Sequence, residues 1–108
     1  MRKENLALSD FDEDFAASLK DNPKKLSNFI KFIIKKYEKD GDFGTFLEGV
    51  NIVARATKGM TEISKETKIS RDTLYKAFSR KGNPEAKTYF DVLKSIGIRI
   101  HYDYAPKY

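Results

Sequence analysis

Apolar residues recur three and four positions apart through most of the chain, and this spacing predicts α-helices. Six such segments follow one another, separated by residues typical of turns. Their expected ranges are residues 8–20, 23–39, 43–58, 61–67, 70–80 and 86–96. Because each apolar stripe needs a partner to cover it, we expect a mainly α fold, a compact helical bundle around one core.

Several expected helix starts carry residues that can accept hydrogen bonds from free backbone amides. Asn22 followed by Pro23 is a strong start signal for the second helix, and Asp42 suits the start of the third. By the same reasoning Thr61 is expected to cap the fourth helix and Ser70 the fifth. These four residues therefore predict where the second to fifth helices begin.

The end of the chain follows a different rule. Residues 98–104 alternate between apolar and polar side chains with the period of two that is typical of a strand. The expected apolar side carries Ile98, Ile100, Tyr102 and Tyr104. A lone strand leaves its backbone groups unpaired, so we expect these residues to form a homodimer interface with a second copy, or to pair with another protein. The alternative is a frayed, partly extended tail.

The segment Met60–Phe78 predicts two short helices joined by a tight turn. The second helix has an apolar side and, opposite it, a face of cations and long hydrogen-bonding side chains. This is the pattern of a helix-turn-helix that reads double-stranded DNA in the major groove. The expected DNA-binding residues are Thr61, Ser70, Arg71, Asp72, Tyr75, Lys76, Ser79 and Arg80.

These residues carry alternative roles. Arg71 lies in the first turn of the expected recognition helix and suits bidentate contact with guanine, with a phosphate contact as the alternative. Lys76 suits a phosphate. Tyr75 fits either a thymine methyl or sugar contact or the edge of the core. Thr61 can serve as a cap and a phosphate donor together.

Charge agrees with the location of this motif. The net charge of the chain is +5, and residues 55–88 hold nine basic and four acidic side chains. Clustered cations attract phosphate without sequence preference. A lysine-rich surface that only keeps the protein soluble is the alternative. The coincidence of charge with the helix-turn-helix favours a DNA operator as the partner.

Composition excludes several other classes. The chain has no cysteine and a single histidine, His101, to which we assign no role, so we expect no metal site and no cofactor. No glycine-rich phosphate loop is present, and Asp12 and Asp14 stand two apart, so they would not converge on a substrate; we expect no catalytic residues and no enzyme activity. No apolar run approaches a membrane span, and the N-terminus lacks the apolar centre of a signal peptide, which favours a cytoplasmic protein without a membrane partner.

Three blocks of sequence carry a family resemblance: VARATKGMTEISKETKISRDTLYKAFS, then GNP, then VLKSIGIRI. Over about residues 42–100 the chain resembles the HigA-like probable addiction module antidotes of the Xre/Cro-type helix-turn-helix superfamily. The resemblance implies a lambda-repressor-like fold and a type II toxin-antitoxin function. Such antitoxins neutralise a RelE/HigB-type ribonuclease toxin and repress their own operon. Lys68 stands at the turn position where the family usually has glycine.

The acidic N-terminal segment is the expected toxin-binding surface, because a toxin that cleaves RNA should be basic. Its candidate residues are Asp10, Phe11, Asp12, Asp14 and Phe15. The alternative is that the two phenylalanines belong to the protein's own core, with the carboxylates placed at a helix N-terminus.

The expected organisation has three parts: a helical extension over residues 1–41, the helix-turn-helix domain over residues 42–97, and the strand and tail over residues 98–108. Two other functions remain open at this point. One is a stand-alone phage-type transcriptional regulator without a toxin, and the other is a protein-binding module whose helix-turn-helix does not bind DNA.

Overall fold

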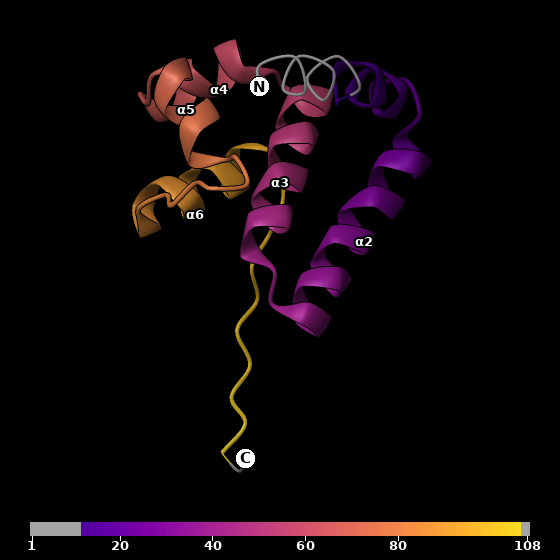
Figure 1. Ribbon diagram of the computed structural model, residues 1–108, viewed down its shortest axis with the longest axis vertical. Coiled ribbons are helices and arrows are strands. Elements are labelled where there is room, and N and C mark those ends of the chain that lie inside the picture. Colours follow the sequence, from indigo (N-terminus) through magenta and orange to yellow (C-terminus); the bar gives the residue numbers. More distant parts are fainter. Residues whose placement is uncertain (1–11, 107–108) are drawn as a thin grey trace.

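A computed structural model describes residues 12–106 of the 108-residue chain. A first helix over residues 12–20, here the N-terminal helix, precedes five labelled helices. These are α2 (Pro23–Asp40), α3 (Phe43–Thr57), α4 (Met60–Thr67), α5 (Arg71–Ala77) and α6 (Ala86–Ser95). Figure 1 shows that α2 and α3 form an antiparallel pair, while α4, α5 and α6 gather on the other side of α3. The predicted mainly α fold is confirmed.

The α2–α3 pair begins and turns where the capping residues predict. The Asn22 side chain accepts a hydrogen bond from the Lys25 amide at 3.1 Å, and Pro23 is the first residue of α2. The Asp42 carboxylate accepts from the Thr45 amide at 3.1 Å and starts α3. Each cap satisfies amides that the helix itself leaves free, so both helix starts are fixed locally.

The core is centred on α3, which is covered from both sides. Leu47, Val50 and Val53 of α3 are fully buried. They share one apolar cluster with Ile33 of α2 and Leu74 of α5. The helices approach closely at Gly49, where an added Cβ would lie 2.8 Å from the Ile33 side chain. A glycine that weakens α3 as an isolated helix is therefore needed for the α2–α3 contact.

The N-terminal helix packs against the second half of α3. Its buried residues Ala16 and Leu19 form a second cluster with Ile52 and Ala56 of α3. The predicted apolar stripe of this helix is thus confirmed from residue 15 onward, and its earlier members lie outside the described residues. Because α3 contributes to both clusters, it connects the N-terminal helices to the rest of the protein.

Two predicted boundaries around the helix-turn-helix are wrong. Helix α4 begins at Met60, directly after Gly59, and no side chain caps it, so Thr61 lies inside the first turn instead of capping it. Helix α5 ends at Ala77 instead of continuing to Arg80, because Phe78 leaves the helical conformation with φ −104° and ψ 56°. The sequence pattern overran this end, since Phe78 is still at helical spacing and still buried.

The predicted C-terminal strand is not formed in this chain. Residues 98–106, here the tail, have no regular secondary structure, and Figure 1 shows them extending away from the helices. The physical reason is that a strand is defined by hydrogen bonds to a neighbouring strand, and none exists among the described residues. The side-chain alternation is present, but a single copy offers nothing to pair with it.

Candidate nucleic-acid interface

Helices α4 and α5 are joined by a turn whose three residues are held by hydrogen bonds. Lys68 adopts the left-handed conformation with φ 64°, and its amide donates to the Ser64 carbonyl at 2.9 Å. The Ser64 hydroxyl donates to the Ile69 carbonyl at 2.6 Å. Ser70 then caps α5, as predicted, by accepting from the Thr73 amide at 3.1 Å. The turn is therefore well defined even though Lys68 costs about 1–2 kcal/mol in this conformation.

The inward side of α5 anchors it to the core. Leu74 is fully buried, and Phe78, just after the helix, is buried to 1% exposure. Both pack in the cluster that contains Ile63 of α4. A helix of seven residues is too short to be stable alone, so this burial is what keeps α5 in place.

The outward side of α5 carries the residues predicted to bind DNA. Arg71 is exposed, and no ion pair among the described residues involves it. Asp72 and Lys76 are exposed and form an ion pair with each other at 3.1 Å, one turn apart. Tyr75 is 38% exposed on the same helix. These side chains can reach a groove without disturbing the core, which is the requirement for direct readout.

The remaining predicted residues differ in their surroundings. Thr61 is exposed near the start of α4. The Ser79 hydroxyl donates to the Lys76 carbonyl at 2.8 Å, so it is used in closing the end of α5. Arg80 lies beyond α5 and donates to Glu48 at 2.8 Å and to the Thr45 hydroxyl at 3.1 Å. In this structure Arg80 therefore ties the loop after α5 to α3.

A buried polar contact that the sequence analysis missed holds the end of α5. Asn51 of α3 is 9% exposed, and its amide donates to the Phe78 carbonyl at 2.9 Å. Its side-chain oxygen accepts from Arg55 at 2.8 Å. The only signal in the sequence was an asparagine among the apolar residues of α3, and helical spacing alone does not identify its partner. Asn51 satisfies a carbonyl that the end of a helix leaves free, so it positions α5 against α3.

The network continues to the N-terminal helix and its predicted toxin-binding residues. Asp12 forms an ion pair with Arg55 at 3.7 Å, so it has an intramolecular partner. The ring of Phe15 packs edge-to-face on Phe29 with centroids 5.0 Å apart, and the Lys25 ammonium lies 5.5 Å from the same ring. Phe15 thus belongs to the protein's own packing.

The other predicted toxin-binding residues divide into two groups. Asp14 is exposed on the N-terminal helix. Asp10 and Phe11 lie outside the described residues. Among the described residues of this set, Asp14 is therefore the one that is exposed to a partner.

Some cations near the helix-turn-helix are already paired. Lys58 forms an ion pair with Glu66 at 2.6 Å, and the Ser95 hydroxyl donates to the same carboxylate at 2.6 Å. The Lys58 contact first, and the Ser95 contact second, lower the pKa of the Glu66 carboxyl below its ordinary value. This cluster joins α3, α4 and α6. Lys65, Lys68 and Lys81 are exposed and remain available to phosphates.

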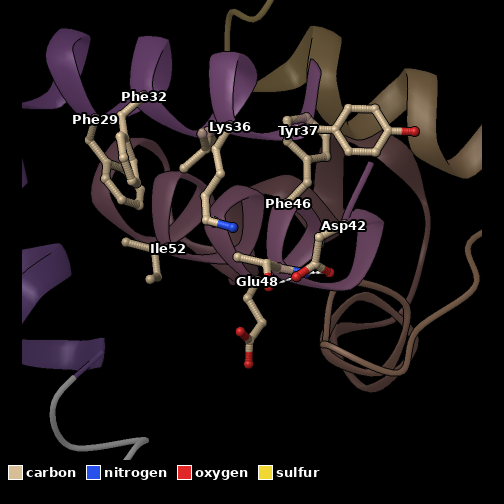
Figure 2. A pocket seen from close by; sticks show the side chains of 11 residues that line it. Phe29, Phe32, Lys36, Tyr37, Asp42, Phe46, Glu48 and Ile52 are labelled. Carbon is tan, nitrogen blue, oxygen red and sulfur yellow. Dashed lines mark hydrogen bonds between the residues drawn. The ribbon is translucent and has the colours of Figure 1, made fainter. Parts of the chain in front are cut away.

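A separate apolar hollow of about 180 Å³ lies between α2 and α3 (Figure 2). Phe29 and Phe32 from α2 face Ile52 from α3 across it, and its lining includes no histidine or cysteine. The charged groups at its edge have partners in the same chain. Asp42 accepts from Thr45, Glu48 accepts from Arg80, and Lys36 donates to Asp40. The polar groups around the hollow are therefore used in contacts within the chain.

No helix within residues 12–106 is both long and apolar enough to cross a membrane. Over the same residues, no group of three or more histidine, cysteine or carboxylate side chains is arranged to hold a metal ion.

The fold and this surface define a class: a small, mainly helical protein with a helix-turn-helix arrangement and a polar outward face on its second helix. Comparison with known proteins then gives the family. The model of the "probable addiction module antidote protein" family matches residues 8–104, and the chain belongs to that family. An uncharacterized protein of Haemophilus influenzae is 30% identical over 71 residues, which cover 66% of this chain and 72% of that protein. No solved structure matches the chain.

Proposed function

We propose that this protein is the antitoxin of a type II toxin-antitoxin module, and that it also represses its own operon by binding DNA as a homodimer. Membership in a family of probable addiction module antidotes supports the antitoxin role and implies a toxin partner. The observation that carries the DNA-binding part is the outward face of α5, where Arg71 and Lys76 are exposed on a helix anchored from behind.

In the proposed complex each copy places α5 in a major groove. Arg71 reads a guanine, Lys76 and the exposed lysines contact phosphates, and Thr61 donates to phosphate at the start of α4. Two copies would contact half-sites about one helical turn apart. A protein that binds an operator in this way acts in the cytoplasm and needs no cofactor or catalytic group.

A double variant tests the DNA-binding face. Arg71→Ala with Lys76→Ala should weaken binding to the DNA upstream of the gene by about tenfold or more. The slope of the logarithm of the binding constant against the logarithm of the salt concentration should become shallower by about one to two. The matched control is Lys31→Ala with Lys35→Ala, which removes two exposed cations from α2. If the two double variants bind alike, α5 is not the reading helix, and a protein-binding module becomes the better account.

The toxin partner is proposed to be a RelE/HigB-type ribonuclease encoded by an adjacent gene. Its basic surface would be attracted by the acidic N-terminal segment, in which Asp14 is exposed. Co-purification of the two gene products, and loss of binding with Asp14→Lys, would support this surface. If no small basic protein is encoded beside this gene, a stand-alone phage-type regulator replaces the antitoxin account.

The homodimer is proposed to form through the tail. Ile98, Ile100, Tyr102 and Tyr104 share one side of an extended chain, and the two tyrosines are 83% and 82% exposed. Exposed aromatic side chains on an unpaired segment favour pairing with a second copy. Truncation after Gly97 should give a monomer in sedimentation, whereas an unchanged dimer would indicate an interface between helices.

A further inference from the structure

The tail is extended and almost free of backbone hydrogen bonds. Its first residue, Ile98, donates its amide to the Leu93 carbonyl at 2.9 Å. No backbone hydrogen bond is formed by residues 99–106 within the described part of the chain. Their amides and carbonyls are therefore available along a whole edge, as in an unpaired strand.

The polar side of the tail carries two opposite charges that cannot meet within one copy. Arg99 and Asp103 are both exposed, and neither takes part in an ion pair among the described residues. They stand four positions apart, which is about 13 Å along an extended chain. His101 lies midway between them on the same side.

We propose that the tails of two copies pair as an antiparallel two-stranded ribbon centred on His101. This inference rests on the proposed homodimer and specifies how the copies meet. With His101 opposite His101 of the second copy, Arg99 lies opposite Asp103 of the second copy, and by symmetry the same pair forms again. Arg99 and Asp103 of each copy, which cannot pair with each other, then both have an ion-pair partner in the second copy.

The same register orders the apolar side. Ile98 lies opposite Tyr104 of the second copy, and Ile100 lies opposite Tyr102, so each direct pair joins a β-branched side chain to an aromatic ring. Such cross-strand pairs, like opposite charges directly facing each other, stabilise antiparallel sheets. Both faces of the ribbon are therefore satisfied by one alignment.

Other alignments lose these pairs. A ribbon centred on Ile100 or on Tyr102 still places apolar residues opposite each other. Centring it on Ile100 puts Arg99 opposite His101, and centring it on Tyr102 puts Arg99 opposite Ala105. A shift that centres the ribbon between two residues puts apolar side chains opposite polar ones, because the side-chain period is two. Among the symmetric registers, only the one centred on His101 pairs Arg99 with Asp103.

The helices supply the support that a two-stranded ribbon needs. An isolated hairpin is marginal in water and requires a packing surface. Phe90 of α6 is 43% exposed and, with Leu93, Ile98 and Ile100, lines a hollow between α6 and the start of the tail. The apolar side of the ribbon can continue into this surface at both ends.

Because the chain has no cysteine, single cysteines report the register cleanly. Directly opposite Cα atoms in an antiparallel pair lie about 4.5–5.5 Å apart, within disulfide range. His101→Cys should therefore form a covalent dimer on mild oxidation. Ile100→Cys and Tyr102→Cys should each cross-link poorly alone, since their like residues would be about 8 Å apart. A mixture of those two variants should cross-link efficiently.

Charge reversal gives an independent readout in solution. Arg99→Asp would place like charges opposite each other twice and should weaken dimerisation by about tenfold, as measured by sedimentation equilibrium. Adding Asp103→Arg to the same chain should restore the dimer. No rescue, or cross-linking at residue 100 as strong as at residue 101, would overturn the proposed register.

The outcomes separate this inference from the proposed function. If the unmutated protein is a dimer but His101→Cys does not cross-link, the copies meet elsewhere and only the ribbon is wrong. If the unmutated protein is a monomer, the ribbon and the homodimer fail together. Operator binding and toxin binding are measured independently, so the antitoxin role is tested apart from both.

Discussion

Helix α5 and the tail have equally clear side-chain patterns, yet α5 forms a helix whereas the tail forms no strand. Helix α5 forms hydrogen bonds within its own backbone, buries Leu74 and is held at its end by Asn51. The tail has the alternation of a strand but no neighbour to bond. A helix forms its hydrogen bonds within one segment, whereas a strand needs a second segment, so a strand pattern predicts structure only together with its partner.

Leu74→Ala breaks the anchored side of the comparison and should have the largest effect. The fully buried side chain is replaced by one that leaves a cavity, so the free energy of unfolding should fall by about 2–5 kcal/mol. Urea denaturation measures the change. The exposed control Lys81→Ala should stay within about 0.5 kcal/mol of the unmutated protein. A loss below that limit for Leu74→Ala would mean that α5 is not anchored by the core.

Asn51→Ala tests the polar contact at the end of α5. It leaves the Phe78 carbonyl and the Arg55 guanidinium without this partner, and should cost about 1–3 kcal/mol of unfolding free energy. Amide hydrogen exchange should accelerate in α5 more than in α2. The exposed control Asn28→Ala on α2 should change neither quantity. Uniform acceleration across all helices would indicate that Asn51 supports the whole fold and does not specifically position α5.

Lys68→Gly tests the left-handed turn before α5. Glycine accepts the left-handed conformation of this residue, and part of the 1–2 kcal/mol strain should be recovered, so we expect a gain of up to about 1 kcal/mol. The matched control, Lys65→Gly, makes the same replacement inside α4 and should lose about 1 kcal/mol. Thermal unfolding compares the two, and changes of the same sign would contradict this reading of the turn.

Acidification should weaken the contact among α3, α4 and α6 slightly. The pKa of Glu66 is lowered in the folded protein by Lys58 and then by Ser95, so its contribution is present above the ordinary glutamate pKa of about 4.3. The contribution is lost as the pH falls from there through the lower pKa of the folded state. Glu66→Gln should therefore melt below the unmutated protein at pH 7, with the gap closing as the pH falls below the ordinary glutamate pKa. The exposed control Glu38→Gln should show no gap at pH 7.

The sequence was sufficient for the features that depend on neighbouring residues. The caps at Asn22, Asp42 and Ser70 follow from hydrogen bonds that span three positions. The left-handed conformation of Lys68 occurs at the position where the resembled family usually has glycine. Local chemistry decides the caps, so they can be predicted before any packing is known.

The features that were missed depend on distant contacts. At the end of α5, Asn51 binds the Phe78 carbonyl from 27 positions away, and just beyond it Arg80 binds Glu48 across 32 positions. The ion pair between Asp12 and Arg55 joins residues 43 positions apart and was not predicted either. Helical spacing gives the face on which a residue lies, but it does not identify what covers that face.

Protection of guanine N7 in the operator tests the central claim most directly, because a bidentate arginine contact in the major groove covers that atom. The unmutated protein should protect one guanine in each half-site from methylation, with the two sites about one helical turn apart. Arg71→Ala should remove that protection while phosphate contacts persist. Unchanged protection with Arg71→Ala, or no protected guanine in the unmutated complex, would contradict the proposal that Arg71 on α5 reads the operator.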